Sequence, residues 1–254
     1  MTHERPAWTP DLLDTPHEVS DKADRVRRMF NAISGRYEFV NSVFSAGRDA
    51  FWRAKATQLA QVCPEDIVLD VACGTGDFAR AFRTAGAARV VGCDFAHEML
   101  LLAASPRSPR PNRPRAGNTW WCEADALRLP FPSSAFTITS CAFGVRNFDD
   151  LDTGFSEMRR VLAPGGRAVI LEFSRPRNRL ARRIYEFYST RVMPLAATLL
   201  SGDRTGAYRY LPRSVVSFVE PDEMCTRLRH VGFDRVTLTP LTMGVVSVYI
   251  ATRD

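Results

Sequence analysis

The chain has 254 residues, which is long enough for one large domain built on a single core. A hydrophobic fraction of 45% and a charged fraction of 24% are those of an ordinary globular protein, which excludes a mainly disordered chain. The net charge of +6 permits nucleic acid, anionic lipid or an anionic metabolite as a partner and does not choose among them.

Cysteine usage and apolar runs narrow the class further. The six cysteines include no Cys-x-x-Cys pair and most lie within apolar runs, so we expect buried thiols in a reducing compartment and no metal site. The first residues lack the apolar core of a signal peptide, and the apolar patch at 192–200 is far shorter than the ~20 residues of a spanning helix. We therefore expect a cytoplasmic protein that is at most peripheral to a membrane.

The first 62 residues are predicted to form a helical segment. Residues 15–18 have the form of a capping box with proline at the first helical position, and apolar residues at helical spacing follow from Val26 to Ile33. Aromatic and small polar residues then alternate without a clean period over 37–47, which favours a loop or a short helix lining a cavity. Another helix is predicted from Trp52 to about Val62.

A strand and a glycine turn follow at residues 67–77. The strand runs into Gly74-Thr75-Gly76, and a helix-compatible apolar segment comes directly after it. This order of strand, turn and helix opens a nucleotide-binding fold. Asp94 lies at about the twenty-residue offset expected of an acid that binds ribose hydroxyls. These features alone do not separate a dinucleotide from S-adenosylmethionine.

Strands and helices alternate beyond the turn, which predicts a parallel α/β sheet with right-handed crossovers. The Arg/Pro-rich stretch 105–115 interrupts this pattern and is predicted to be a solvated surface loop, with contact to lipid or nucleic acid as the less favoured alternative. A tight turn is predicted at Pro164-Gly165-Gly166. The strands are predicted at 89–94, 119–123, 136–141 and 168–172, and the helices at 97–104 and 151–162.

The last third of the chain carries an insertion and a closing unit. Apolar residues near one helical face over 180–200 predict an inserted helical element, which packs on the core or covers an apolar substrate as a lid. A helix at 222–230 and an antiparallel hairpin at the sheet edge follow. We therefore expect one domain made of an N-terminal helical segment, a cofactor-binding core, a helical lid and a closing helix with strands, at 1–62, 63–174, 175–220 and 221–254.

Three further features favour S-adenosyl-L-methionine as the cofactor. Asp70 precedes the glycine turn on the strand, Asp125-Ala126 ends the third strand, and the Pro-Gly-Gly turn joins a helix to the fifth strand. Together they resemble the class I S-adenosylmethionine-dependent methyltransferases, in which the corresponding acids hold the ribose and the adenine amino group. A second mononucleotide-binding half or a Tyr-x-x-x-Lys pair, expected of a dehydrogenase, is not visible. The predicted cofactor residues are Asp70, Gly74, Thr75, Gly76, Asp94, Asp125 and Ala126.

From Phe30 to its end the chain resembles the C-methyltransferases of ubiquinone and menaquinone biosynthesis. Residues 37–53 are similar to the first signature of that family, 160–174 to its second, and Gly144-Val145-Arg146-Asn147 to its Gly-x-Arg-Asn motif. Segments near 185–188, 192–194, 202–203 and 208–214 resemble its lid. The resemblance implies methylation of a prenylated hydroquinone, most directly demethylmenaquinol to menaquinol.

Some positions depart from the family pattern. Glu38 and Asp49 stand where the first signature usually has Asp and His, Ala142 stands where a serine is expected, and the Arg/Pro loop is atypical. Two alternatives therefore stay open: a paralogue that acts on an aromatic secondary metabolite, and a non-catalytic cofactor-binding subunit of a quinone-making assembly. Peripheral contact with a membrane and a homodimer are also left open.

The chemistry of carbon methylation suggests roles for individual residues. A sulfonium methyl group is already activated, so the protein mainly aligns the nucleophile and excludes water. A ring carbon becomes electron-rich when a phenol ionises, and a cation near the oxygen lowers that barrier. Arg146 is therefore predicted to stabilise a phenolate and Asn147 to orient a substrate hydroxyl or a water. The substrate wall is predicted at Tyr37, Asn41, Tyr185, Tyr188, Tyr208 and Tyr210, with ordinary aromatic packing as the alternative for each.

Overall fold

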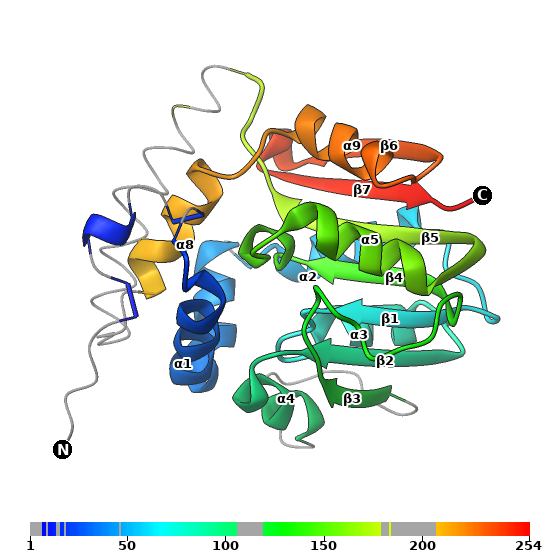
Figure 1. Ribbon diagram of the computed structural model, residues 1–254, viewed down its shortest axis with the longest axis horizontal. Coiled ribbons are helices and arrows are strands. Elements are labelled where there is room, and N and C mark those ends of the chain that lie inside the picture. The colour runs from blue at the N-terminus through cyan, green and yellow to red at the C-terminus, as the bar shows by residue number, and fades with distance from the viewer. Residues whose placement is uncertain are drawn as a thin grey trace.

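The computed structural model describes residues 7–8, 10–13, 16–17, 19–45, 47–105, 119–178, 183 and 207–254 (Figure 1). For residues 10–11, 36–44 and 207–209 it describes the backbone alone. The predicted lid at 180–200 and most of the Arg/Pro stretch thus lie outside the described residues, apart from Arg183 and Ser105.

Seven strands of the described chain form one sheet in the order β3-β2-β1-β4-β5-β7-β6. Strands β1 to β5 run parallel, whereas β7 runs antiparallel to both β5 and β6 and so forms the predicted hairpin at the edge. The bounds are β1 Ile67–Val71, β2 Arg89–Asp94, β3 Thr119–Glu123, β4 Phe136–Ala142, β5 Leu162–Phe173, β6 Arg235–Leu241 and β7 Val246–Thr252. The predicted mostly parallel α/β sheet is confirmed.

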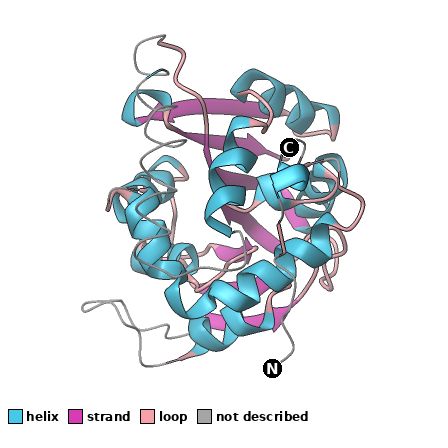
Figure 2. Cartoon of the chain, turned by 90° about the vertical axis from the view of Figure 1, so that its left-hand side faces the viewer, coloured by secondary structure: helices cyan, strands magenta, loops and turns pink. Residues whose placement is uncertain are grey.

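Helices cover both faces of this sheet (Figure 2). Alternate residues of each central strand point to opposite faces, so Leu69 and Ile170 join a core with α5 (Leu151–Val161) and α9 (Pro221–His230). Val68 and Val169 join a second core with α2 (Asp49–Leu59) and α3 (Asp77–Thr84). Two buried layers are what strands apolar on both faces require.

A third core lies beyond the carboxyl ends of the parallel strands, on the side to which they point in Figure 1. Here α1 (Lys22–Phe44) and α8 (Ala207–Val216) pack with η1 (Pro10–Leu13) and α4 (His97–Ala104). The ring of Trp8 stacks on that of Tyr210 with their centroids 4.2 Å apart. This cluster, here called the α1–α8 roof, covers the edge of the sheet at which ligands bind in open α/β folds.

Two local predictions were wrong. The first long helix begins at Lys22, not beside Pro16, and it continues through residues 37–44, where a loop or a short helix was expected. The Pro164–Gly166 turn falls within the bounds of β5, where the pairing with β4 shifts between Phe136 and Ile138. Gly165 has a φ of +77° there, and its N–H donates to the carbonyl of Arg253. The glycine allows an irregularity inside the strand where the sequence suggested a separate turn.

None of the described helices is long and apolar enough to cross a membrane. All six cysteines are free thiols, and four of them are buried. No cluster of three potential metal ligands occurs among the described residues.

Candidate active site

The glycine turn after β1 is closely packed at Gly76. Gly76 has a φ of +81°, and a Cβ there would lie 2.3 Å from a ring carbon of Trp121 and 2.8 Å from the guanidinium of Arg80. Both the backbone angle and the available space therefore require glycine. The turn lies at the carboxyl end of β1, a strand that pairs with β2 on one side and with β4 on the other.

Asp94, at the end of β2, is buried and ties the turn to the next element. Its carboxylate accepts hydrogen bonds from the backbone N–H of Gly74 at 2.8 Å and of Ala96 at 2.9 Å. Burial raises the pKa of Asp94 to about 6, although these backbone donors oppose the shift. A carboxylate offers about four lone-pair positions, so both oxygens keep acceptor capacity for hydroxyl groups in the cavity that Asp94 lines.

Asp70 lies fully buried on β1, behind the glycine turn. Ser140 donates to Oδ1 at 2.7 Å, whereas Oδ2 accepts no hydrogen bond of normal geometry from the described residues. Burial raises the pKa of Asp70 to about 7. A buried carboxylate oxygen without a donor is costly, and a cationic or N–H-bearing ligand group would satisfy it.

Arg53 lines a small polar pocket together with Asp70 and Thr75. Its guanidinium is buried, donates to Asp49 at 2.6 Å and lies over the ring of Phe143. Among the described residues its Nε has no hydrogen-bond partner. The pocket thus pairs an acid lacking one donor with a cation lacking one acceptor, which suits the ammonium and carboxylate of an amino-acid group.

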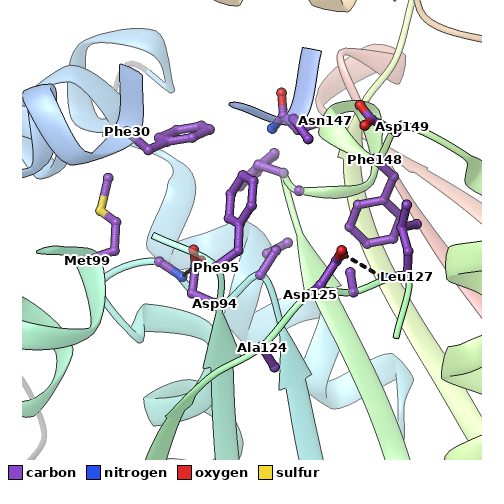
Figure 3. Close-up of a pocket in the computed structure, with 17 residues that line it drawn as sticks. Phe30, Asp94, Phe95, Met99, Ala124, Asp125, Leu127, Asn147, Phe148 and Asp149 are labelled. Carbon is purple, nitrogen blue, oxygen red and sulfur yellow. Dashed lines mark hydrogen bonds between the residues drawn. The ribbon is translucent and has the colours of Figure 1, made fainter. Parts of the chain in front are cut away.

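A cavity of about 100 Å³, here called the main cavity because the predicted cofactor acids line it, opens beside this pocket and shares Gly74, Ala72 and Ala142 with it (Figure 3). Asp94 and Asp125 lie on its polar side, and the backbone N–H of Leu127 donates to Asp125. Ala126 also lines it. The apolar walls come from Phe30, Phe95, Met99, Leu127, Phe143 and Phe148.

The Gly-x-Arg-Asn segment forms η2 (Val145–Asn147) at the carboxyl end of β4. Asn147 lines the cavity, and its Oδ1 accepts a hydrogen bond from the hydroxyl of Tyr210 at 2.9 Å. Arg146 does not line this cavity. Its buried guanidinium pairs with Glu172 at 2.7 Å and donates to the carbonyl of Phe143. The motif thus aims one side chain at the cavity and uses the other to anchor the turn to β5.

The structure describes the predicted substrate residues unevenly. Tyr210 is fully buried under Trp8 and reaches the cavity through Asn147, without lining it. The backbones of Tyr37 and Asn41 belong to α1 and that of Tyr208 to α8, but their side chains lie outside the described part, as do Tyr185 and Tyr188 altogether. Contact between these five residues and a substrate stays a prediction.

Several residues of the site were not predicted. Phe95 and Phe148 each directly follow a predicted residue, Asp94 and Asn147, and position next to a site residue was the one signal available for them. Arg53 stood within the first family signature without a role. Asp149 lines the cavity beside Phe148. Nothing in the sequence indicated this position, because an acid just before a helix is most often a helix cap.

Known methyltransferases resemble this chain in sequence. The model of the ubiE/COQ5 methyltransferase family matches residues 18–253. A ubiquinone/menaquinone biosynthesis C-methyltransferase of Geobacter sulfurreducens is 41% identical over 94% of this chain and 92% of its own length. The demethylmenaquinone methyltransferase of Thermus thermophilus is 42% identical over 89% of this chain and 100% of its own.

Solved structures share the fold at low sequence identity. A SAM-dependent methyltransferase of Thermotoga maritima superposes with a TM-score of 0.63 and 17% identity, covering 89% of this chain and 99% of its own. A SAM-dependent methyltransferase of Aquifex aeolicus gives a TM-score of 0.57 and 15% identity, covering 84% and 96%. At such identities the likeness speaks for the fold alone.

Proposed function

Because this chain belongs to the ubiE/COQ5 methyltransferase family, we propose that it methylates a ring carbon of a prenylated hydroquinone and converts demethylmenaquinol to menaquinol. The enzyme is an S-adenosylmethionine-dependent methyltransferase. The observation that carries the choice of acceptor is the cavity itself, in which cofactor-type acids face largely aromatic walls and one amide. An aromatic ring fits such walls and leaves a hydroxyl to meet the amide.

The residues present fit the cofactor. Asp94 would accept from the ribose hydroxyls, and Asp125 from the adenine amino group, with the ring of Phe95 between these two acids. The free oxygen of Asp70 would take the ammonium of the methionine part, and Arg53 its carboxylate. When bound, S-adenosylmethionine supplies a methyl group already activated on a sulfonium sulfur.

Asn147 is the residue that we assign to the substrate oxygen. Because Tyr210 donates to Oδ1, the orientation of the amide is fixed and its NH₂ group is left to donate to a phenolic oxygen. That donor stabilises the negative charge that grows on the oxygen as the ring carbon attacks. Arg146 then contributes as a positioning residue, because its ion pair with Glu172 holds the turn that carries Asn147.

The departure at Asp49 does not favour a different acceptor. Asp49 is buried in an ion pair with Arg53, next to the pocket assigned to the methionine group, and Ser45 donates to its other oxygen. The substitution therefore concerns how the cofactor end of the site is held. A secondary metabolite as acceptor and a non-catalytic role are kept as outcomes of the test below.

The test is methyl transfer from labelled S-adenosylmethionine to a short-tailed demethylmenaquinol kept reduced. We expect a product one methyl group heavier, and Asn147→Ala should lower kcat by about 100-fold because one donor to a developing oxyanion is lost. Tyr210→Phe should cause a smaller loss, since the amide stays but its orientation is no longer fixed. Cofactor affinity should not change in either variant.

The opposing outcomes are distinct. Transfer to other phenols but not to the quinol would identify a paralogue with another substrate. Cofactor binding with no transfer to any acceptor, combined with unchanged quinones in a deletion strain, would leave only the non-catalytic reading. Accumulation in that strain of a quinone one methyl group lighter supports the proposal.

A further inference from the structure

Three acids line the main cavity within the described chain, and one of them has no part in holding the cofactor. Asp94 and Asp125 end strand β2 and follow strand β3, where the cofactor acids are expected. Asp149 instead follows Asn147 by two residues and lies beside it on the opposite wall of the cavity (Figure 3). Its carboxylate therefore shares the wall at which the substrate hydroxyl is placed above.

Asp149 also lines a second, more polar cavity of about 340 Å³ behind that wall. Lys22 lies there, almost fully buried, and its ammonium donates to the carbonyl of Phe148 at 2.5 Å. Burial lowers the pKa of Lys22 to about 8, and the negative charge of Asp149 opposes this shift. Asp149 thus lines both the largely apolar main cavity and the second cavity, where the ammonium of Lys22 stabilises its ionised form.

The charged groups around Asp149 come from every element packed against it. Helix α1 contributes Lys22 and Asp24, and the loop after β3 contributes Asp125. Burial raises the pKa of Asp149, Lys22 lowers it, and the two acids raise it further. The other ionisable groups around the second cavity are His17, Arg146, Asp150 and Arg227, with Tyr210 close by on α8.

We propose that Asp149 is the general base that removes the phenolic proton during methyl transfer, with Lys22 as the positioning residue that keeps it ionised. The proposal rests on the function proposed above. The step needs no reactant other than the quinol, S-adenosylmethionine and water. The O–H bond of the substrate breaks and the proton goes to Asp149, while the electron pair remains on the ring oxygen and makes the ortho carbon nucleophilic.

The carbon–methyl bond forms as the methyl–sulfur bond breaks, and the bond pair leaves on sulfur. The hydrogen on the methylated carbon then leaves as a proton to water, which restores aromaticity, and the ring oxygen takes up a proton from water to give the methylated hydroquinone, so that one proton is released overall. Because a neutral phenol has a pKa near ~10, the proton moves to a carboxylate as the ring gives up electron density, not before. Asp149 is partly buried but keeps contact with solvent, so it can pass the proton on to water.

Other groups near the site do not serve as well. His17 does not line the main cavity, and burial lowers its pKa to about 4, which makes it a weak base. The hydroxyl of Tyr210 donates a hydrogen bond to Asn147, and burial raises the pKa of Tyr210 above the usual range. Lys22 and Arg146 line the second cavity only. Among the described residues of the substrate wall, Asp149 is the one carboxylate.

The rival role for Asp149 is structural. Its carboxylate lies near the first turn of α1, where the backbone N–H of Ala23 lowers its pKa, so it could act as a cap contributed by another element. A cap affects the free energy of unfolding but neither the pH dependence of kcat nor its response to added carboxylates. These readouts separate the two roles.

The experiment compares kcat against pH for the wild type, Asp149→Asn and Asp150→Asn, using the reduced short-tailed demethylmenaquinol. Asp150 is the matched control, because it is the neighbouring acid, does not line the main cavity and caps α5, a role that asparagine retains. We expect Asp149→Asn to lower kcat at pH 7 by at least 100-fold, with unchanged affinity for S-adenosylhomocysteine, and Asp150→Asn to match the wild type.

Two further measurements test the base itself. Added formate should restore part of the activity of Asp149→Ala, and Lys22→Met should move the acidic limb of the kcat profile to higher pH because the carboxylate loses its cation. Wild-type transfer with an unchanged kcat in Asp149→Asn would overturn the proposal, as would a loss of kcat explained by unfolding and not rescued by formate. Failure of the wild type itself to methylate the quinol would overturn the proposed function instead.

Discussion

Two buried carboxylates of the site, Asp70 and Asp94, have raised pKa values. Burial raises the pKa of Asp70 to about 7 and that of Asp94 to about 6, from an ordinary value near 4. Both acids therefore hold a proton in the folded protein over part of the range in which they are ionised when unfolded. Within about pH 4 to 7 the folded state binds more protons than the unfolded one, so stability without ligand falls as pH rises through this window.

Cofactor binding should reverse that preference, because ammonium and hydroxyl donors favour the ionised carboxylates. We predict that binding releases protons and that the affinity for S-adenosylhomocysteine rises at least tenfold between pH 5.5 and 7.5. Isothermal titration calorimetry in two buffers of different ionisation enthalpy measures both quantities. Asp94→Asn should reduce the dependence to the part that Asp70 contributes, and Asp125→Asn should keep all of it. A wild-type affinity that is constant with pH would contradict the assignment of these two acids.

At the residue scale, the acids predicted to bind the cofactor lie in the cavity or in the pocket beside it, whereas most of the apolar residues that line the cavity were not predicted. Asp70, Asp94 and Asp125 could be found because each follows or ends a recognisable strand. Phe95 and Phe148 could not, since an apolar residue reads the same in a cavity wall as in a core. Arg146 looked like a substrate ligand because its pairing with Glu172 joins positions that are distant in sequence and visible only in the fold.

The connection between β6 and β7 stores backbone strain. Within η4 (Thr242–Gly244), Thr242 and Met243 have φ angles of +48° and +57°, which lie in the left-handed region. Trp52 donates to the hydroxyl of Thr242 at 2.8 Å, and Ser174 donates to the carbonyl of Gly244. These two contacts hold the turn against α2 and the end of β5. Met243 itself is 80% exposed and gains nothing from burial.

We predict that Met243→Gly stabilises the protein by about 0.5–1 kcal/mol. Glycine removes the cost of the left-handed conformation, about 1–2 kcal/mol, but part of this gain is lost because glycine gives up more backbone entropy on folding. Urea denaturation measures the change. Gly244→Ala is the matched control and should destabilise, because its φ is +89° and a Cβ would lie 3.3 Å from the backbone of Pro176. If both variants lost stability, strain in the turn would not be the cause.

At the element scale, periodic strands and helices were predicted closely, and the departures have physical reasons. β2 and α4 have the predicted bounds because an apolar run and a polar boundary coincide at each end. The continuation of α1 to Phe44 was missed because aromatic and polar residues alternate there without a helical period. A helix of 23 residues adds turns by propagation once it has formed, whatever the pattern at its end.

At the scale of the whole molecule, residues of all three cores line the main cavity, among them Phe148, Phe143 and Met99. The strand order changes direction between β1 and β4, and the glycine turn, η2 and the α1–α8 roof all lie at that edge. A ligand bound there would contact Asp94 and Asp125 and also Phe30 and Met99 of the third core. Its binding energy is therefore added to the stability of the whole fold.

We expect S-adenosylhomocysteine at 100 times its dissociation constant to stabilise the protein by about 2.7 kcal/mol, which raises Tm by about 5 °C for a chain of this length. Differential scanning calorimetry at several ligand concentrations measures it. Asp94→Asn should lose most of the response at the same concentration, whereas Asp150→Asn should keep it. An equal response in Asp94→Asn would place the cofactor elsewhere.

The position of β7 between β5 and β6 also affects how the chain is made. Strand β5 ends at Phe173, but among the described residues the strand that pairs with its second edge is β7, which ends at Thr252. Synthesis of the roughly 80 intervening residues takes about 4–16 s at about 5–20 residues per second. During that time Ala168 to Leu171, buried in the finished protein, present an unpaired apolar edge. Nascent chains on one messenger are thus open to strand pairing with each other until β7 has been made.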